Sequence, residues 1–284
     1  MPDLPIILEA RDLSRHFGGL KAVEGVHLKI HGGAPPPPVD EDVKDVDVKI
    51  RAGHLHSIIG PNGAGKTTLF NLLSGVLKPT RGQVLLRGED ITAYPPHRIA
   101  HLGLGRSYQI TNIFPNLTVL ENVRLAAQAL GRDNFKLFTP ASRFKQYEEK
   151  AMTALEETGL ARQAYAIAHT LPAGDKRKFE LAILLAQDPE ILLLDEPTSG
   201  LAGELVPEFM ALVDRVRKAG HKTVVMIEHN MNIVMSLSDR ISVMHQGQLL
   251  AEGAPAEIAA NPTVQKAYLG ELYGDLSEMT GAKV

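Results

Sequence analysis

The chain contains no cysteine and no tryptophan. The absence of cysteine excludes disulfides and thiol chemistry, and it leaves the cellular compartment open because cysteine-free proteins occur in all of them. No apolar run approaches the roughly 20 residues that a membrane-spanning helix requires. The opening residues MPDLPIILEARD place no positive charge ahead of a long apolar run, so they predict no secretory signal. We therefore expect a cytosolic protein.

An excess of basic charge is also absent. The chain has 30 Lys and Arg residues against 33 Asp and Glu, and a net charge of −3. Such a balance does not predict binding to nucleic acid. Hydrophobic residues make up 44% and charged residues 22%, as in a soluble globular protein. With 284 residues, the chain is expected to form one large domain or one domain with a subdomain.

Strand-like and helix-like segments alternate along most of the chain. This alternation predicts a parallel α/β core, and a long helical stretch in the middle predicts a helical subdomain set into it. Strands are predicted over 6–17, 23–30, 54–60, 81–91, 191–196, 222–229 and 240–253, and helices over 67–79, 95–103, 118–160 with a polar break at 131–142, 175–187, 203–220 and 232–239.

Residues 31–53 interrupt the expected order. They include HGGAPPPPVDED, which cannot form regular helix or an inner strand because proline fixes φ and lacks the N–H. The end of this segment, VKDVDVKIRAG, echoes VEGVHLKIHGG at 23–33. A duplication of one strand unit at a hairpin is the preferred explanation, and a chance match between two alternating strands is the other.

The stretch GPNGAGKTT matches the phosphate-binding loop G-x-x-x-x-G-K-[ST], and it lies between a predicted strand and a predicted helix, as that motif requires. Its glycines allow backbone N–H groups to point at phosphate oxygens, and the helix N-terminus adds partial positive charge. Lys66 is placed to reach the β- and γ-phosphates, and Thr67 to hold Mg²⁺. The predicted nucleotide-binding residues are Gly60, Pro61, Asn62, Gly63, Ala64, Gly65, Lys66, Thr67 and Thr68.

The segment ILLLDEP is predicted to be a buried strand that carries two carboxylates at its C-terminal end. In open α/β sheets, ligands bind at that end of the strands. Asp195 fits the role of a Mg²⁺-holding group, and Glu196 that of a general base for the attacking water. His229 ends the next buried strand and is a candidate for contact with the γ-phosphate. Gln109 is a candidate Mg²⁺ ligand through its amide oxygen.

Taken in order, GPNGAGKTT, Gln109, the segment LPAGD, ILLLDEP, SGLA and His229 resemble the nucleotide-binding subunit of an ABC transporter. The resemblance covers nearly the whole chain. FGGLKAVEGV, LHSIIGPNGAGKTTLFNLL, IEHNMNIVMSLSDRI and KAYLGE look like the ATPase subunits of branched-chain amino acid importers. ATPase subunits for urea uptake or lipopolysaccharide export have similar C-terminal sequences, and they are the alternatives to the amino acid importer.

The resemblance implies a P-loop NTPase core with an antiparallel β subdomain, roughly residues 1–110 and 160–255, and an inserted helical subdomain, roughly 110–175. It implies ATP and Mg²⁺ as ligands, a second ATP-binding subunit, two transmembrane permease subunits and, indirectly, an extracytoplasmic substrate-binding protein. It also implies a peripheral place on the inner face of the cell membrane, with no nucleic acid partner. The chain's activity would be ATP hydrolysis coupled to transport.

The resemblance assigns two further elements near the site. Phe17 matches the aromatic that stacks on adenine, although its distance to Gly60 exceeds the family pattern by about the length of the proline insert. Removing one repeat copy restores the spacing, which favours the duplication.

Ala202 in SGLA stands where the family usually has Asp or Asn. That departure weakens the polar contact expected across a dimer.

The segment LPAGD occupies the position of the family's signature, which contacts the γ-phosphate bound to the other subunit. We call residues 171–175 the signature segment: Leu171, Pro172, Ala173, Gly174 and Asp175. Leu171 and Gly174 agree with the pattern, whereas Pro172 removes both a serine hydroxyl and an N–H. Asp175 is predicted to be the N-cap of the following helix. Loss of one hydrogen bond to a charged phosphate costs about 1.5 to 3 kcal/mol.

A competent ATPase with a weakened signature is the preferred interpretation, because Lys66, Asp195, Glu196 and His229 are all present. A subunit that binds ATP without hydrolysing it beside an active partner, or a regulatory module without turnover, is the rival. A soluble cassette protein acting on nucleic acid or ribosomes is a third hypothesis. It is disfavoured because the chain carries one cassette and no sustained heptads.

Overall fold

A computed structural model describes residues 5–32, 53–107, 113–131, 145–219 and 222–267. The proline-rich part of the insert and its repeat, residues 33–52, lie outside these ranges, as does Gln109. None of the helices within them has the length and apolar character that crossing a bilayer requires.

An antiparallel sheet is built from the N-terminal hairpin and a second, shorter one. Its strands are β1 (Ile6–Phe17), β2 (Leu20–His31), β4 (Arg81–Leu86) and β5 (Glu89–Asp90), in the order β2-β1-β4-β5. β1 and β2 turn at Gly18, where φ is +58°, a conformation that glycine adopts without steric cost. Buried and exposed residues alternate along much of β2, so one face of this hairpin packs inward.

The second sheet has six strands in the order β10-β9-β3-β8-β7-β6. Five are parallel neighbours, and β10 closes the edge antiparallel to β9. Every residue of β3, β7 and β8 is buried, which is the pattern of parallel strands covered on both faces. The bounds are β3 (Leu55–Ile59), β6 (Leu104–Arg106), β7 (Ile191–Asp195), β8 (Thr223–Ile227), β9 (Arg240–His245) and β10 (Gln248–Gly253).

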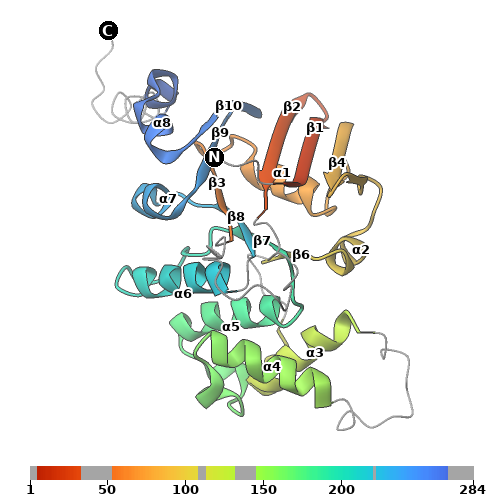
Figure 1. The fold of residues 1–284 in the computed structure, drawn as a ribbon, viewed down its shortest axis with the longest axis vertical. Coiled ribbons are helices and arrows are strands. Elements are labelled where there is room, and N and C mark those ends of the chain that lie inside the picture. The colour runs from red at the N-terminus through yellow and green to blue at the C-terminus, as the bar shows by residue number, and fades with distance from the viewer. Residues whose placement is uncertain (1–4, 33–52, 108–112, 132–144, 220–221, 268–284) are drawn as a thin grey trace, which may run out of the picture.

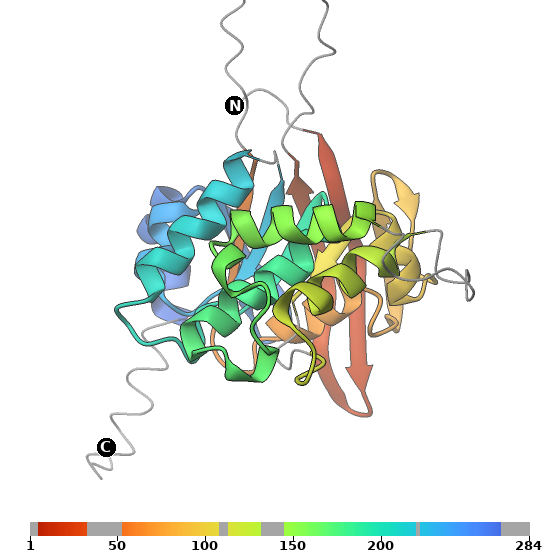
Figure 2. The ribbon, with the colours of Figure 1, turned by 90° about the horizontal axis from the view of Figure 1, so that it is seen from below.

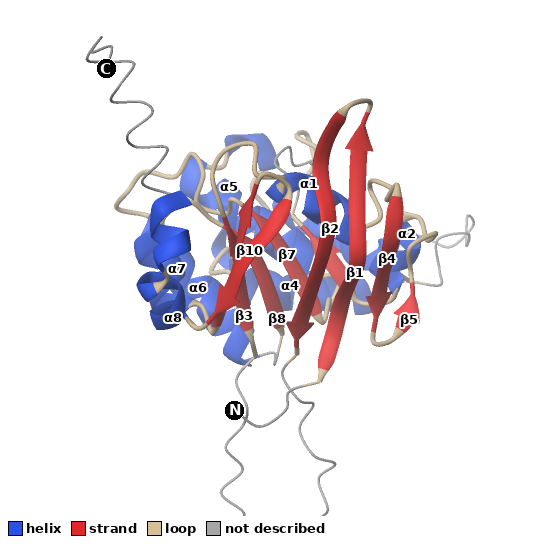
Figure 3. Cartoon of the chain, turned by 90° about the horizontal axis from the view of Figure 1, so that it is seen from above, coloured by secondary structure: helices blue, strands red, loops and turns tan. Residues whose placement is uncertain are grey.

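The helices surround the parallel sheet. α3, α4 and α5 gather at one end of the molecule, away from β1, β2 and β4 (Figure 1), and cover the strands when seen from that end (Figure 2). From the other end, the strands of both sheets lie in front of the helices (Figure 3). The helices are α1 (Lys66–Leu73), α2 (Pro96–His101), α3 (Val119–Ala129), α4 (Lys145–Glu157), α5 (Ala173–Leu185), α6 (Val206–Ala219), α7 (Met231–Leu237) and α8 (Pro255–Ala260).

The core is divided by the parallel sheet. Leu192 and Leu194 of β7 belong to a cluster with α3, α4, α5 and α6, whereas Ile191 and Leu193 pack with α1 and the antiparallel sheet. This division follows from the two-residue period of a strand, which sends successive side chains to opposite faces. Phe70 of α1 is fully buried in the second cluster. A parallel sheet, an antiparallel sheet and a separate group of helices agree with the architecture that the resemblance implies.

The prediction of the first helix was wrong at its C-terminal end. The sequence predicts a helix that continues to Pro79, but α1 ends at Leu73. Gly75 follows with φ of +72°, and an added Cβ would lie 2.5 Å from Ile99. The glycine therefore turns the chain before the proline is reached.

The start of α5 also differs from the prediction. The helix begins at Ala173, with Pro172 as its N-cap, because the Lys176 N–H already donates to the Pro172 carbonyl at 3.0 Å. Asp175 lies in the first turn and is not the cap. An acid there still interacts favourably with the helix N-terminus.

A buried histidine lies in β3, the strand that leads to the phosphate loop. His56 of β3 is fully buried, and its Nε2 atom lies 2.8 Å from the Ser242 hydroxyl on β9. Its Nδ1 atom is buried and has no hydrogen-bond partner among the described residues. Burial, reinforced by the nearby His54, lowers the pKa of His56 to about 3.

We predict that His56 makes the fold sensitive to acid. Its pKa is lowered in the folded state, so the unfolded chain takes up a proton first and stability falls between pH 6.5 and about 3. The slope is at most about 1.4 kcal/mol per pH unit. His56→Gln, which keeps a polar atom near Ser242, should lose less stability between pH 7.5 and 5 in urea unfolding. An equal loss of unfolding free energy in the wild type and the variant would contradict this prediction. The difference between the two proteins at pH 7.5 measures the effect of the substitution on packing.

Candidate active site

The phosphate loop follows β3 and leads into α1. Gly60, Gly63 and Gly65 have φ of +151°, +77° and +97°. An added Cβ at Gly60 would lie 2.1 Å from the Met244 carbonyl, and one at Gly65 would lie 2.2 Å from the Ala22 carbonyl. These two positions therefore require glycine for space as well as for conformation.

Lys66, the first residue of α1, is buried beneath this loop. Its Nζ atom donates to the carbonyls of Gly60 at 2.6 Å and Pro61 at 2.8 Å. Both carbonyls belong to the loop itself, so the ammonium group lies within the curve that the loop forms. A cation held there favours a negatively charged ligand in the same space.

A cavity of about 550 Å³ opens over the loop. It brings together several residues that the sequence predicts for one site, namely Phe17, Asn62 to Thr68, Glu196 and His229. Sequence reasoning missed four other lining residues, which are Leu20, Lys21, Ala22 and Gln246. They come from β2 and from the turn between β9 and β10, and no local motif connects these segments to the loop.

Phe17 lines the cavity. The residue is 43% exposed, and the guanidinium of Arg15 lies 4.6 Å from the centre of its ring. Arg15 is also held by the Lys78 carbonyl at 2.9 Å. A cation over one ring face is favourable and leaves the exposed part of the ring for a second aromatic group.

Glu196 and His229 meet in the cavity. The His229 Nε2 atom lies 2.9 Å from the Glu196 Oε1 atom, and both side chains are partly exposed. Glu196 has φ of +48°, which is uncommon for a residue with a Cβ. Its N–H donates to the Ile227 carbonyl at 3.0 Å, so β8 holds the residue in this conformation beyond the end of β7.

A buried carboxylate next to His229 connects the segments that follow β7 and β8, and sequence reasoning missed it. Glu228 Oε1 accepts hydrogen bonds from the N–H and the hydroxyl of Thr198, at 3.0 and 2.6 Å. Its Oε2 atom accepts from the His229 N–H at 3.1 Å. The only signal in the sequence was an acid at the end of a buried strand. Its contact with Thr198 arises because β7 and β8 are neighbours.

Asp195 is buried at the end of β7, and its partner is an arginine that the sequence did not single out. Arg106 Nη2 donates to Asp195 Oδ2 at 3.2 Å, and the two side chains are 7% and 2% exposed. Asp195 Oδ1 is buried with no hydrogen-bond partner among the described residues. Burial raises the pKa of the Asp195 carboxyl, and the charge of Arg106 offsets part of this rise.

The signature segment does not line this cavity. Pro172, Gly174 and Asp175 instead line a separate hollow of about 190 Å³ on the same subunit, with Leu201, Leu205 and Phe209. An added Cβ at Gly174 would lie 2.9 Å from Leu205, so the glycine allows α5 to approach the segment that precedes α6. Leu171 is buried, and Ala173 is the first residue of α5.

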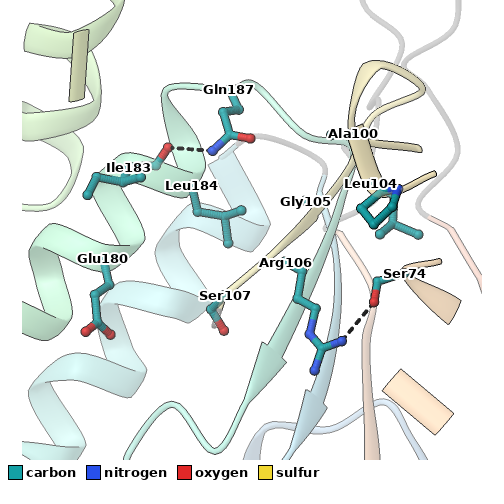
Figure 4. A pocket seen from close by; sticks show the side chains of 11 residues that line it. Ser74, Ala100, Leu104, Gly105, Arg106, Ser107, Glu180, Ile183, Leu184 and Gln187 are labelled. Carbon is teal, nitrogen blue, oxygen red and sulfur yellow. Dashed lines mark hydrogen bonds between the residues drawn. The ribbon is translucent and has the colours of Figure 1, made fainter. Parts of the chain in front are cut away.

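A groove of about 250 Å³ lies between β6 and α5. Glu180, Ile183 and Leu184 of α5, and Gln187 in the turn that follows it, line one side of the groove (Figure 4). Ser74, Ala100, Leu104, Gly105, Arg106 and Ser107 line the other side. Arg106 thus belongs to the groove wall and also contacts Asp195.

The sequence matches two family models. One, described as ABC transporter, matches residues 43–199. The other, described as Branched-chain amino acid ATP-binding cassette transporter, matches residues 248–273. The ATPase chemistry predicted from the phosphate loop agrees with the first match.

Similar full-length proteins are known. The chain is 42% identical to the high-affinity branched-chain amino acid transport ATP-binding protein BraF of Pseudomonas aeruginosa, over 93% of this chain and 98% of that one. It is 40% identical to LivG of Escherichia coli K12, with the same coverage. It is 33% identical to the lipopolysaccharide export system ATP-binding protein LptB of Acidithiobacillus ferridurans, over 81% of this chain and 91% of that one.

Solved structures agree with this relationship. A nucleotide-free ATP-binding cassette from an ABC transporter superposes with a TM-score of 0.76 and 28% identity, over 93% of this chain and 98% of the other. The ADP conformation of an ATP-binding cassette of an ABC transporter superposes with a TM-score of 0.75 and 28% identity, over 93% of this chain and 99% of the other. The chain therefore belongs to the family of ABC transporter ATP-binding subunits, and within it to the group of branched-chain amino acid transport ATP-binding proteins.

Proposed function

We propose that the protein is the ATP-hydrolysing subunit of an importer for branched-chain or other hydrophobic amino acids. The observation that carries the proposal is the single cavity that joins the phosphate loop with Glu196 and His229. The substrate class rests on the names of the relatives BraF and LivG. Lipopolysaccharide export, suggested by LptB, is less well supported because that relative matches less of the chain.

In this proposal, the loop binds the triphosphate. The N–H groups of Asn62 to Thr68 face the phosphate oxygens, and the start of α1 adds partial positive charge. Lys66 exchanges its loop carbonyls for the β- and γ-phosphates. Phe17 stacks on the adenine, because this exposed aromatic residue lines the same cavity.

Glu196 then acts on the attacking water. As a partly exposed carboxylate at the cavity wall, it can accept a proton or orient the water for attack. His229 contacts Glu196 at 2.9 Å and fixes its direction, and it donates to the γ-phosphate when that group is bound. Glu228 holds the backbone of both segments in place.

The residues present fit a magnesium ion. Asp195 Oδ1 is buried and unpaired among the described residues, and such a carboxylate oxygen is the kind of ligand or water acceptor that Mg²⁺ prefers. Thr67 lines the cavity and offers its hydroxyl, and Gln109, outside the described residues, is the third proposed ligand. When bound, Mg²⁺ would neutralise charge on the β- and γ-phosphates.

The proposed partners are assigned to two surface features outside the nucleotide cavity, which are the hollow at the signature segment and the groove between β6 and α5. The signature segment lies in a hollow of its own, so we propose that it acts on ATP bound to a second ATP-binding subunit. The groove beside Ser107 and Glu180 is proposed to receive a helix of a transmembrane permease subunit, at the border of the helical subdomain (110–175). An extracytoplasmic binding protein would deliver substrate, and this chain would lie at the cytoplasmic face of the membrane.

Glu196→Gln tests the proposed chemistry. The amide keeps the shape but cannot take a proton, so ATP hydrolysis should fall by about 100-fold or more, while a fluorescent ATP analogue still binds. Glu190→Gln is the matched control, because Glu190 precedes the same strand at its other end. Unchanged hydrolysis in Glu196→Gln would overturn the assignment of the base.

Pro172→Ser tests the signature segment. Pro172 is the N-cap of α5 and offers no side-chain hydrogen bond. Serine restores a hydroxyl there, so ATPase activity should rise, by up to about tenfold to a hundredfold at limiting ATP. Stability should change little, because a serine cap gains about 1 kcal/mol and the loss of proline costs a similar amount. Pro172→Ala is the control without the hydroxyl; an equal rise in both variants would refute the role of that group.

A further inference from the structure

We propose that Arg106 prevents Asp195 from binding a divalent cation until nucleotide phosphates are present. Arg106 would thus be a positioning residue that makes metal binding depend on ATP. This inference rests on the proposed Mg²⁺-ATP site. It concerns the order in which the site is filled, which neither the phosphate loop nor the Glu196–His229 pair specifies.

The first observation is that the two side chains are closed off from solvent together. Arg106 and Asp195 are 7% and 2% exposed, and their closest atoms, Nη2 and Oδ2, are 3.2 Å apart. Water screens such a pair poorly. The positive charge of Arg106 therefore acts at nearly full strength on any cation that approaches Asp195 Oδ1.

The second observation is that the guanidinium is held from the opposite side. Its Nη1 atom donates to Asn71 Oδ1 at 2.7 Å and to the Ser74 hydroxyl at 2.8 Å, both on or directly after α1. A planar guanidinium fixed by two acceptors and a carboxylate cannot swing away as a surface lysine does. Its charge is thus a permanent part of the site.

These two observations define the electrostatic balance. Asp195 alone would attract a divalent cation, but the pair of Asp195 and Arg106 has no net charge. Lys66 adds a further positive charge and Glu196 a further negative charge in the same region, so the four side chains have no net charge. Without nucleotide the region therefore offers a cation no net attraction, and a triphosphate in the loop adds the negative charge that attracts it. Arg106 contacts Oδ2, whereas Oδ1 has no hydrogen-bond partner among the described residues and is the atom that the cation would contact.

The test measures binding of Mn²⁺ alone to the full chain, by electron paramagnetic resonance, in the absence of nucleotide. Wild-type protein should bind Mn²⁺ weakly. Arg106→Gln should bind it at least about tenfold more tightly, because a fixed positive charge is removed. Adding Asp195→Asn to Arg106→Gln should abolish the gain, since the ligand is lost.

Two further variants separate charge from structure. Arg106→Lys keeps the charge and should bind Mn²⁺ as weakly as wild type, and this expectation holds even if Arg106→Gln does not fold. Arg217→Gln is the matched control. Arg217 is equally buried and paired with Asp214 and Asp239, but Asp239 lies beside Leu55 at the start of β3, the end opposite the phosphate loop. Its variant should leave Mn²⁺ binding unchanged.

The outcomes are distinguishable. Unchanged or weaker Mn²⁺ binding in Arg106→Gln, or a tenfold gain in Arg106→Lys, overturns the inference. Binding of a fluorescent ATP analogue in EDTA, measured on the same samples, tests the proposed function separately. If no variant and no wild-type sample binds the analogue, the nucleotide site itself is refuted, whatever the Mn²⁺ result.

Discussion

Parallel pairing of β3, β8 and β7 is the constraint on which the site depends. Ile58 is opposite Ile227, and Asp195 is also opposite Ile227, so the three strands end at the same edge of the sheet. The phosphate loop, the carboxylates and His229 each follow one of these ends. Hydrophobic burial on both faces fixes this register, because a slip of one residue would exchange the two faces of every strand.

The cavity is assembled from charges that are paired before any ligand binds. Lys66 is held by loop carbonyls, Glu196 by His229, and Asp195 by Arg106. Each pairing reduces the cost of keeping a charged group away from water. Lys66, Glu196 and His229 line the cavity, and Asp195 Oδ1 has no hydrogen-bond partner among the described residues. A ligand can therefore exchange partners with the site without rebuilding it.

Most of the fold followed from the sequence, and the errors have local causes. The predicted strands and helices occur in the predicted order because long periodic segments carry a strong signal, whereas the short elements β6 and α8 were not predicted. The end of α1 was wrong because Gly75 turns the chain before Pro79. The start of α5 was wrong because Pro172 serves as N-cap without a side-chain hydrogen bond, so the more familiar cap, Asp175, was preferred. The contacts of Arg106 with Asn71 and Asp195, and of Glu228 with Thr198, could not be predicted, because each joins residues at least 30 positions apart.

The sequence alone determined which chemical groups are present. GPNGAGKTT specifies a phosphate loop, and Asp195, Glu196 and His229 follow buried strands, because these are properties of short segments. Only the tertiary structure decided how these groups are paired. It placed Arg106 against Asp195 and Gln246 at the cavity, and it separated the signature segment from the loop of its own subunit. The reason is that strand order and helix packing set distances between segments, and no local pattern records them.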